Sequence, residues 1–184
     1  VRLVRCEGGT CAAARNAGAA VSSGRILCFV DADTMVPENA VHHILERHEG
    51  EGRCLVLYRL ASREPGIRAW LWWTFWGLAR QLPLAKAKSM PAFMSCDRRH
   101  FERYGPFVES WAIAEEWPLT GAAYRYHRER FLYDRRLTAR TSSRRMELQP
   151  LGYVRTFLKW VSVVLFPRAR TSLTDRIRHQ PGDR

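Results

Sequence analysis

The sequence has few lysines, no closely paired cysteines and no apolar run long enough to cross a bilayer. Of 30 basic residues only three are lysines: Lys86, Lys88 and Lys159. The five cysteines are scattered without a C-x-x-C pair, which argues against a disulfide framework or a zinc knuckle and favours a reducing, cytoplasmic compartment. The apolar stretches at 69–79 and 156–166 are shorter than the roughly 20 residues that a spanning helix needs.

Two familiar ligand-binding patterns are also missing. The chain has no G-x-x-x-x-G-K-[ST] phosphate loop, and Gly8-Gly9-Thr10 is too short to be a dinucleotide fingerprint. The six histidines do not fall at metal-ligand spacing. Chemistry therefore has to be sought among the carboxylates and arginines.

Enough apolar material is present for one folded domain. Hydrophobic residues make up 46% of the 184 positions, which excludes disorder over most of the chain. The formal net charge is +12, and residues 98–184 alone hold 18 basic against 9 acidic side chains. Such an excess favours a polyanionic partner, either a nucleic acid, an anionic membrane surface or a phosphorylated substrate.

Hydrophobic periodicity predicts an alternation of strands and helices. We expect strands at 1–5, 25–30 and 54–60, the second of them buried on both faces. Thr10 is placed to cap a helix over 11–22, and Pro37 to open another that ends at Gly50. This order predicts a three-layer α/β domain with a mainly parallel sheet.

Beyond residue 62 the pattern changes. Residues 69–79 are almost wholly apolar and carry four of the seven tryptophans, between Arg68 and Arg80. This composition suits a helix at a membrane interface, and equally a helix packed in a core or a dimer contact. We expect the domain to occupy residues 1–145, and residues 146–184 to form a C-terminal amphipathic helix and a basic tail.

Asp31-Ala32-Asp33 directly follows the predicted strand at 25–30. Ligands of open α/β sheets bind outside the carboxyl ends of strands. Two carboxylates one residue apart can converge on a hard cation such as Mg²⁺ or Mn²⁺, which completes its shell with phosphate oxygens and water. An Asx turn that ends the strand would use the same residues.

Four ordered motifs together resemble family 2 glycosyltransferases, which have the GT-A (Rossmann-like) fold. They are ARNAG at 14–18, the glycine-strand-D-x-D run at 24–34, the segment at 92–107 containing Arg98-Arg99 and Phe101-Glu102, and AEEW at 114–117. The resemblance extends from about residue 1 to residue 145. It implies a GT-A-like α/β fold and a nucleotide-diphosphate sugar as donor.

The resemblance also implies roles for individual residues. Asp33 would ligate the divalent cation, and Asp31 would lie near the ribose or base and help to orient the metal. Arg15 and Asn16 would line the nucleotide pocket, although surface charge and helix polarity would explain them as well. Glu116 would be the general base.

A single carboxylate base suits transfer with inversion, because it needs only to accept the proton of the acceptor hydroxyl opposite the departing diphosphate. Glu115 is the alternative base. The pair could also serve as a helix N-terminus, with Pro118 in the first turn. In this sequence Glu116 stands where the family usually has Asp, and Pro118 where many members carry another acid.

Arg144 and Arg145 resemble a basic pair that follows the base motif in related enzymes. They could contact a diphosphate or an anionic lipid, or form a solvated charge run. A Q-x-x-R-W motif, which processive relatives carry in this region, is absent. We therefore expect transfer of a single sugar rather than polymer synthesis.

The resemblance further implies a first βαβ unit that the chain lacks, so we expect an N-terminally truncated domain. The expected location is the cytoplasm, with peripheral attachment to the inner face of the membrane, and the acceptor would be a lipid or a glycan. A nucleotidyltransferase on a related fold remains an alternative, as does a non-catalytic basic module that binds membrane or nucleic acid. Nucleic acid is the least favoured partner.

Overall fold

The computed structural model describes residues 3–6, 9–84, 88–89, 91–111, 113–144, 154–155, 157–158 and 161–162. Its first half alternates helices and strands. The elements are α1 (Cys11–Val21), β1 (Ile26–Val30), β2 (Thr34–Met35), α2 (Ala40–Leu45), the π-helical turn η1 (Glu46–Gly50) and β3 (Leu55–Ser62). The second half contains α3 (Ile67–Ala79), β4 (Phe93–Asp97), α4 (Arg98–Tyr104), α5 (Trp117–Tyr126), the 3₁₀ turn η3 (Arg128–Arg130) and β5 (Phe131–Thr141).

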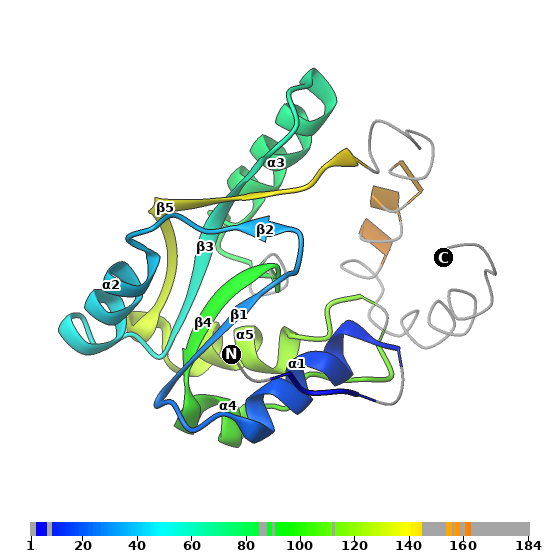
Figure 1. The fold of residues 1–184 in the computed structure, drawn as a ribbon. Coiled ribbons are helices and arrows are strands. Elements are labelled where there is room, and N and C mark those ends of the chain that lie inside the picture. Colours follow the sequence, from blue (N-terminus) through cyan, green and yellow to red (C-terminus); the bar gives the residue numbers. More distant parts are fainter. Residues whose placement is uncertain are drawn as a thin grey trace.

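The five strands form one mixed sheet in the order β1-β4-β3-β5-β2 (Figure 1). β1, β3 and β5 share one direction, while β4 is antiparallel to both β1 and β3, and β2 is antiparallel to β5. The parallel neighbours are thus β3 and β5. The expected α/β fold is confirmed, with β4 inserted antiparallel between β1 and β3, and with β2 antiparallel at the edge next to β5.

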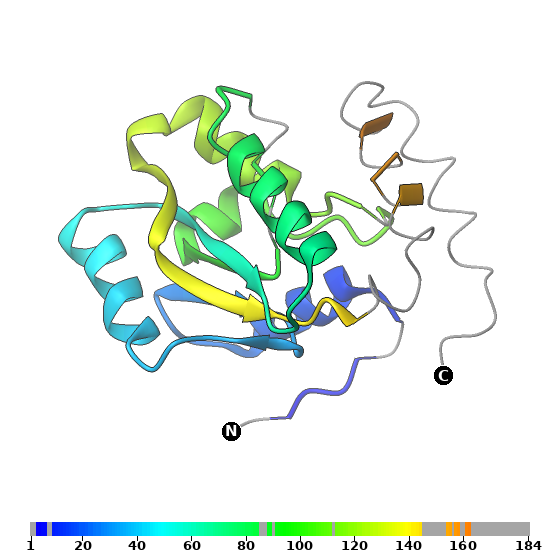
Figure 2. The ribbon, with the colours of Figure 1, turned by 90° about the horizontal axis from the view of Figure 1, so that it is seen from above.

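Helices cover both faces of the sheet, as three layers require (Figure 2). α2 lies on one face, where His48 of η1 contacts Ser95 of β4. α3 and α5 lie on the other face, where Gly77 of α3 lies close to the Tyr133 hydroxyl of β5. The core between these layers centres on residues 55–58 of β3, all fully buried.

Local signals explain several elements. Thr10 caps α1 by accepting a hydrogen bond from the amide of Ala13 at 3.1 Å, as its position predicts. The second helix begins at Ala40 rather than at Pro37 and finishes as the π turn η1. α5 begins directly after Glu116, with Pro118 in its first turn, which confirms that expectation.

Two strand expectations were wrong. Residues 3–6 are not in a strand, because no neighbouring strand among the described residues pairs with them. β1 is buried on one face only: Leu27 and Phe29 are buried, whereas Val30 on the other face is 43% exposed. The reason is that β1 forms an edge of the sheet, while α2 and η1 contact β4 and β5.

Most of the predicted C-terminal segment 146–184, including most of the apolar stretch 156–166, lies outside the described residues. Its described residues, 154–155, 157–158 and 161–162, are helical. The ring of Phe157 lies 5.3 Å from that of Phe75 in α3. No described helix is both long and apolar enough to cross a membrane.

Candidate active site

The two aspartates of the D-x-D motif lie in the turn between β1 and β2. The amide of Asp31 donates to the carbonyl of Ala92 at 3.0 Å, which aligns the turn with the start of β4. The carboxylate of Asp33 accepts a hydrogen bond from the Thr141 hydroxyl at 3.3 Å, and its carbonyl accepts one from the amide of Ser142 at 3.2 Å. The end of β5 is thus brought beside Asp33.

Arg15 of α1 joins the D-x-D turn to the acidic pair. Its guanidinium lies 2.5 Å from the carboxylate of Asp31 and 2.7 Å from that of Glu115. Burial alone would lower the pKa of Arg15, but these two carboxylates raise it above its ordinary value. Three predicted site residues, separated by up to 100 positions, therefore meet at one point.

The backbone turns sharply just before the acidic pair. Ala114 is buried and has φ = 63°, a left-handed conformation that costs a residue with a Cβ about 1–2 kcal/mol. Such conformations cluster at functional sites, where the surrounding structure maintains them. After this turn the side chain of Glu115 reaches Arg15, while Glu116 becomes the N-cap residue of α5.

Glu116 is fully buried, and within the described structure one of its two carboxylate oxygens is bonded. The hydroxyl of Ser89 donates to Oε1, whereas Oε2 has no hydrogen-bond partner among the described residues. Burial, reinforced by the nearby charge of Glu115, raises the pKa of Glu116 to about 7. A carboxylate with this pKa and a free oxygen can accept a proton near neutral pH.

Ser89 is held by groups that the sequence did not single out. Arg80, buried at the end of α3, donates from Nε to the carbonyl of Ser89 at 3.0 Å. The ammonium of Lys88 donates to the carbonyl of Leu82 at 2.7 Å and to that of Arg80. Burial lowers the pKa of Lys88 to about 8. No local pattern marks these residues, because their contacts with one another and with Glu116 form only in the folded chain.

The carboxylate oxygens at the D-x-D turn suit a hard cation that is shared with a substrate. Asp33 is exposed, and among the described residues its carboxylate has only the long contact with Thr141, so it is available to a ligand. In the described part of the chain no three His, Cys, Asp or Glu side chains form a closed metal site. Mg²⁺ is commonly held by one or two carboxylates together with substrate phosphates and water, which is what this turn offers.

Asn16, expected in the nucleotide pocket, is bonded to the loop after α4. Its amide nitrogen donates to the carbonyl of Phe107 and to the carboxylate of Glu109, both at 2.9 Å. Its amide oxygen accepts from the amide of Phe107 at 2.9 Å. The side chain thus ties α1 to residues 107–109, and a contact with the donor remains a prediction.

The arginine pair is only partly described. Arg144 is exposed and lies two residues after Ser142, whose amide donates to the carbonyl of Asp33. Arg145 lies outside the described residues. Their contact with a diphosphate remains a prediction.

The comparison with known families agrees with this geometry. A model described as Glycosyl transferase family 2 matches residues 1–105, more than half of the chain and including β1, the D-x-D turn and α4. The chain belongs to the family 2 glycosyltransferases. A search of curated proteins finds no match.

Proposed function

We propose that the domain transfers one sugar from a nucleotide-diphosphate sugar to an acceptor hydroxyl with inversion, and that Glu116 is the general base. The observation that supports this proposal is the buried Glu116 carboxylate, which has one oxygen without a partner in the described part of the chain and a pKa raised to about 7. Glu115 is the weaker candidate, because its carboxylate already pairs with Arg15 at 2.7 Å.

In the proposed reaction Glu116 Oε2 accepts the proton of the acceptor hydroxyl. The acceptor oxygen then forms a bond with the anomeric carbon, and the bond between that carbon and the diphosphate oxygen breaks. The diphosphate leaves with the electron pair. No covalent intermediate is needed, so one base and a stabilised leaving group suffice.

The leaving group would depart at the D-x-D turn. A Mg²⁺ or Mn²⁺ ion held by Asp33, with Asp31 beside it, would neutralise charge on the departing diphosphate. Arg15 holds Asp31 in place at 2.5 Å. Arg144 and Arg145 would supply further cationic contacts, since guanidinium groups match phosphate oxygens well.

We also propose that the protein attaches peripherally to the inner face of the cell membrane and acts on a lipid or glycan acceptor. Exposed apolar side chains on α3 support attachment, among them Ile67 and Trp70. Transfer of a single sugar, rather than polymer synthesis, agrees with the missing Q-x-x-R-W motif.

The test is release of nucleoside diphosphate from a panel of UDP-, GDP- and dTDP-sugars in the presence of Mn²⁺. We expect Asp33→Asn to abolish Mn²⁺-dependent release and to weaken Mn²⁺-dependent binding of the nucleoside diphosphate. Glu38→Gln, which changes an exposed carboxylate nearby, should do neither. Full turnover by Asp33→Asn would overturn the metal assignment.

The same assay separates the alternatives. A nucleotidyltransferase would release pyrophosphate from a nucleoside triphosphate and a sugar phosphate, and no nucleoside diphosphate from the sugar panel. A binding module would show no turnover, and its binding would not depend on Asp33.

A further inference from the structure

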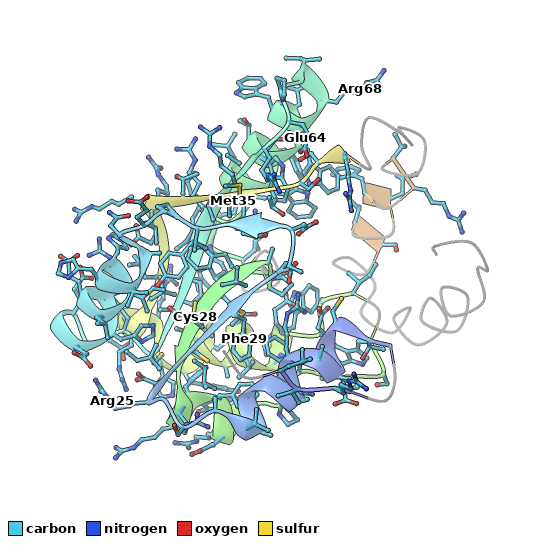
Figure 3. The ribbon with its side chains drawn as sticks, in the orientation of Figure 1. Arg25, Cys28, Phe29, Met35, Glu64 and Arg68 are labelled. Carbon is cyan, nitrogen blue, oxygen red and sulfur yellow. The ribbon has the colours of Figure 1, made fainter. Side chains whose placement is uncertain are left out.

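A cavity of about 490 Å³ lies between α3 and the β3–β5 ribbon, and nothing in the proposed chemistry uses it. Its lining includes Arg59 of β3, Arg135 and Arg140 of β5, and Trp70 of α3. The volume is within the range of small-molecule sites. Figure 3 shows Glu64 near the N-terminal end of α3. Arg68 lies at this outer end of the helix and points away from the sheet.

The three cavity arginines are not neutralised by the rest of the described structure. None of them forms an ion pair with a described carboxylate, and Arg135 has only a neutral partner, the Gln81 side chain at 2.7 Å. The cavity contains one acid, Glu64, whose carboxylate accepts from Ser142 Oγ at 2.9 Å and from the amide of Ser143 at 2.6 Å. The lining therefore has an excess of positive charge.

The start of α3 adds to the positive electrostatic potential of the cavity. Pro65 and Gly66 line the cavity, and α3 has neither a side-chain cap nor an acidic residue in its first turn. The free amides and the positive end of the helix dipole at this point favour an anion. The charge and the helix terminus both favour a group such as phosphate.

The rim of the cavity is apolar. Ile67, Trp70, Leu71 and Leu78 recur at helical spacing on α3 and are 55–68% exposed. Trp70 and Leu78 also line the cavity. A phosphate site whose border is a strip of exposed Trp, Leu and Ile suits a ligand with a charged head and an apolar body.

We infer that this cavity binds the phosphate-bearing headgroup of an anionic phospholipid, with the apolar strip of α3 lying in the membrane interface. The inference rests on the peripheral attachment proposed above and names its ligand. It is independent of glycosyl transfer, because the cavity does not include Asp33 or Glu116.

The test is co-sedimentation of the full chain with vesicles of phosphatidylcholine alone or with 30% phosphatidylglycerol. We expect Arg59→Gln/Arg135→Gln/Arg140→Gln to weaken binding to the anionic vesicles at least about tenfold. Arg99→Gln/Arg125→Gln/Arg136→Gln is the matched control: it removes the same charge from exposed positions outside the cavity lining and should change binding less than threefold. Trp70→Ala should also weaken binding.

Any of the following three outcomes would overturn the proposed lipid site. Equal losses in the two triple variants would mean diffuse attraction to the surface. Displacement from vesicles by millimolar inorganic phosphate would make the ligand the free ion. A stable dimer without vesicles, made monomeric by Trp70→Ala, would make α3 a contact between copies.

Absence of binding to any vesicle would overturn peripheral attachment as well. Nucleoside diphosphate release, measured without vesicles, should be equal in the wild type and both triple variants, so a failure of the proposed transferase activity is detected separately.

Discussion

The two faces of the sheet each bury a carboxylate, but in opposite states. Asp134 of β5, on the α2 face, accepts hydrogen bonds from His43 Nε2 and Arg47 Nε, both at 2.6 Å, and from the amide of Arg136 at 2.7 Å. Burial would raise the pKa of Asp134, but these donors lower it below the ordinary value. Glu116, on the other face, has one bonded oxygen and a raised pKa.

This difference shows that burial alone does not determine whether a carboxylate serves stability or proton transfer. A buried carboxylate with donors on both of its oxygens stays ionised and holds elements together, here α2 to β5. A buried carboxylate with a free oxygen is held near its protonation midpoint, which is unfavourable for stability and suitable for proton transfer. The following predictions test this contrast, from the largest expected effect to the smallest.

Glu116→Gln should lower the rate of sugar transfer about 10²–10⁴-fold, because the amide cannot accept the proton. The same change should stabilise the fold. Since the pKa of Glu116 is higher in the folded state, ionisation weakens folding as pH rises from about 4.5 through about 7.

Removing that cost should add about 3 kcal/mol at pH 8, or roughly 6–12 °C in Tm. Rates and thermal melting at pH 8 check both parts, with Glu102→Gln, an exposed carboxylate on α4, as the control. A variant that is destabilised and fully active would contradict the contrast.

Asp134→Asn should destabilise the fold and leave the rate of sugar transfer unchanged. It leaves the buried Arg47 with one anionic partner, Glu51, instead of two, and should lower the free energy of unfolding by about 3 kcal/mol. Because the pKa of Asp134 is lowered by folding, its contribution is present above the unfolded pKa and lost as pH falls below about 4.

Thermal melting at pH 7 and pH 3 should therefore show a smaller difference from the wild type at pH 3 than at pH 7. The rate of sugar transfer by the folded variant should be unchanged within about twofold. A large loss of rate at full stability would place Asp134 in the chemistry.

Ser89→Ala should move the acidic limb of the pH–rate profile to higher pH by about one unit. The Ser89 hydroxyl stabilises the ionised Glu116 and so lowers its pKa, and without it protonation persists to higher pH. Ser89→Thr, which keeps a hydroxyl, should restore the profile if it is accommodated. A uniform loss of rate at every pH would indicate only a structural role.

Glu115→Gln should shift the same limb the other way, by about one unit. The negative charge of Glu115 raises the pKa of Glu116, so its removal lets Glu116 ionise at lower pH. If instead the variant loses activity by the factor expected for Glu116→Gln, Glu115 is the base.

Much of the framework was predictable because it depends on local chemistry. The Thr10 cap of α1, the strand before Asp31, and Pro118 in the first turn of α5 all follow from neighbouring residues. The position of β4 between β1 and β3 was not predictable, because antiparallel insertion depends on pairing between segments about 40–70 residues apart.

The residues of the candidate site were likewise predictable only in part. Asp31, Asp33, Glu115 and Glu116 stood out as acidic pairs at element ends. The partners that set their states did not, because Ser89 and Thr141 carry no distinguishing pattern. Hydrogen bonds over long sequence separations depend on the fold, and side-chain type alone does not reveal them.

Two adjacent residues of α1, Arg15 and Asn16, connect this helix to both parts of the site. Arg15 ties the turn after β1 to Glu115, and Asn16 ties the same helix to Phe107. An opening of α1 would release both connections at once, so the segments 107–116 and 31–33 should exchange their amide hydrogens as one cooperative unit with α1. A short surface helix would then set how often the two halves of the site separate.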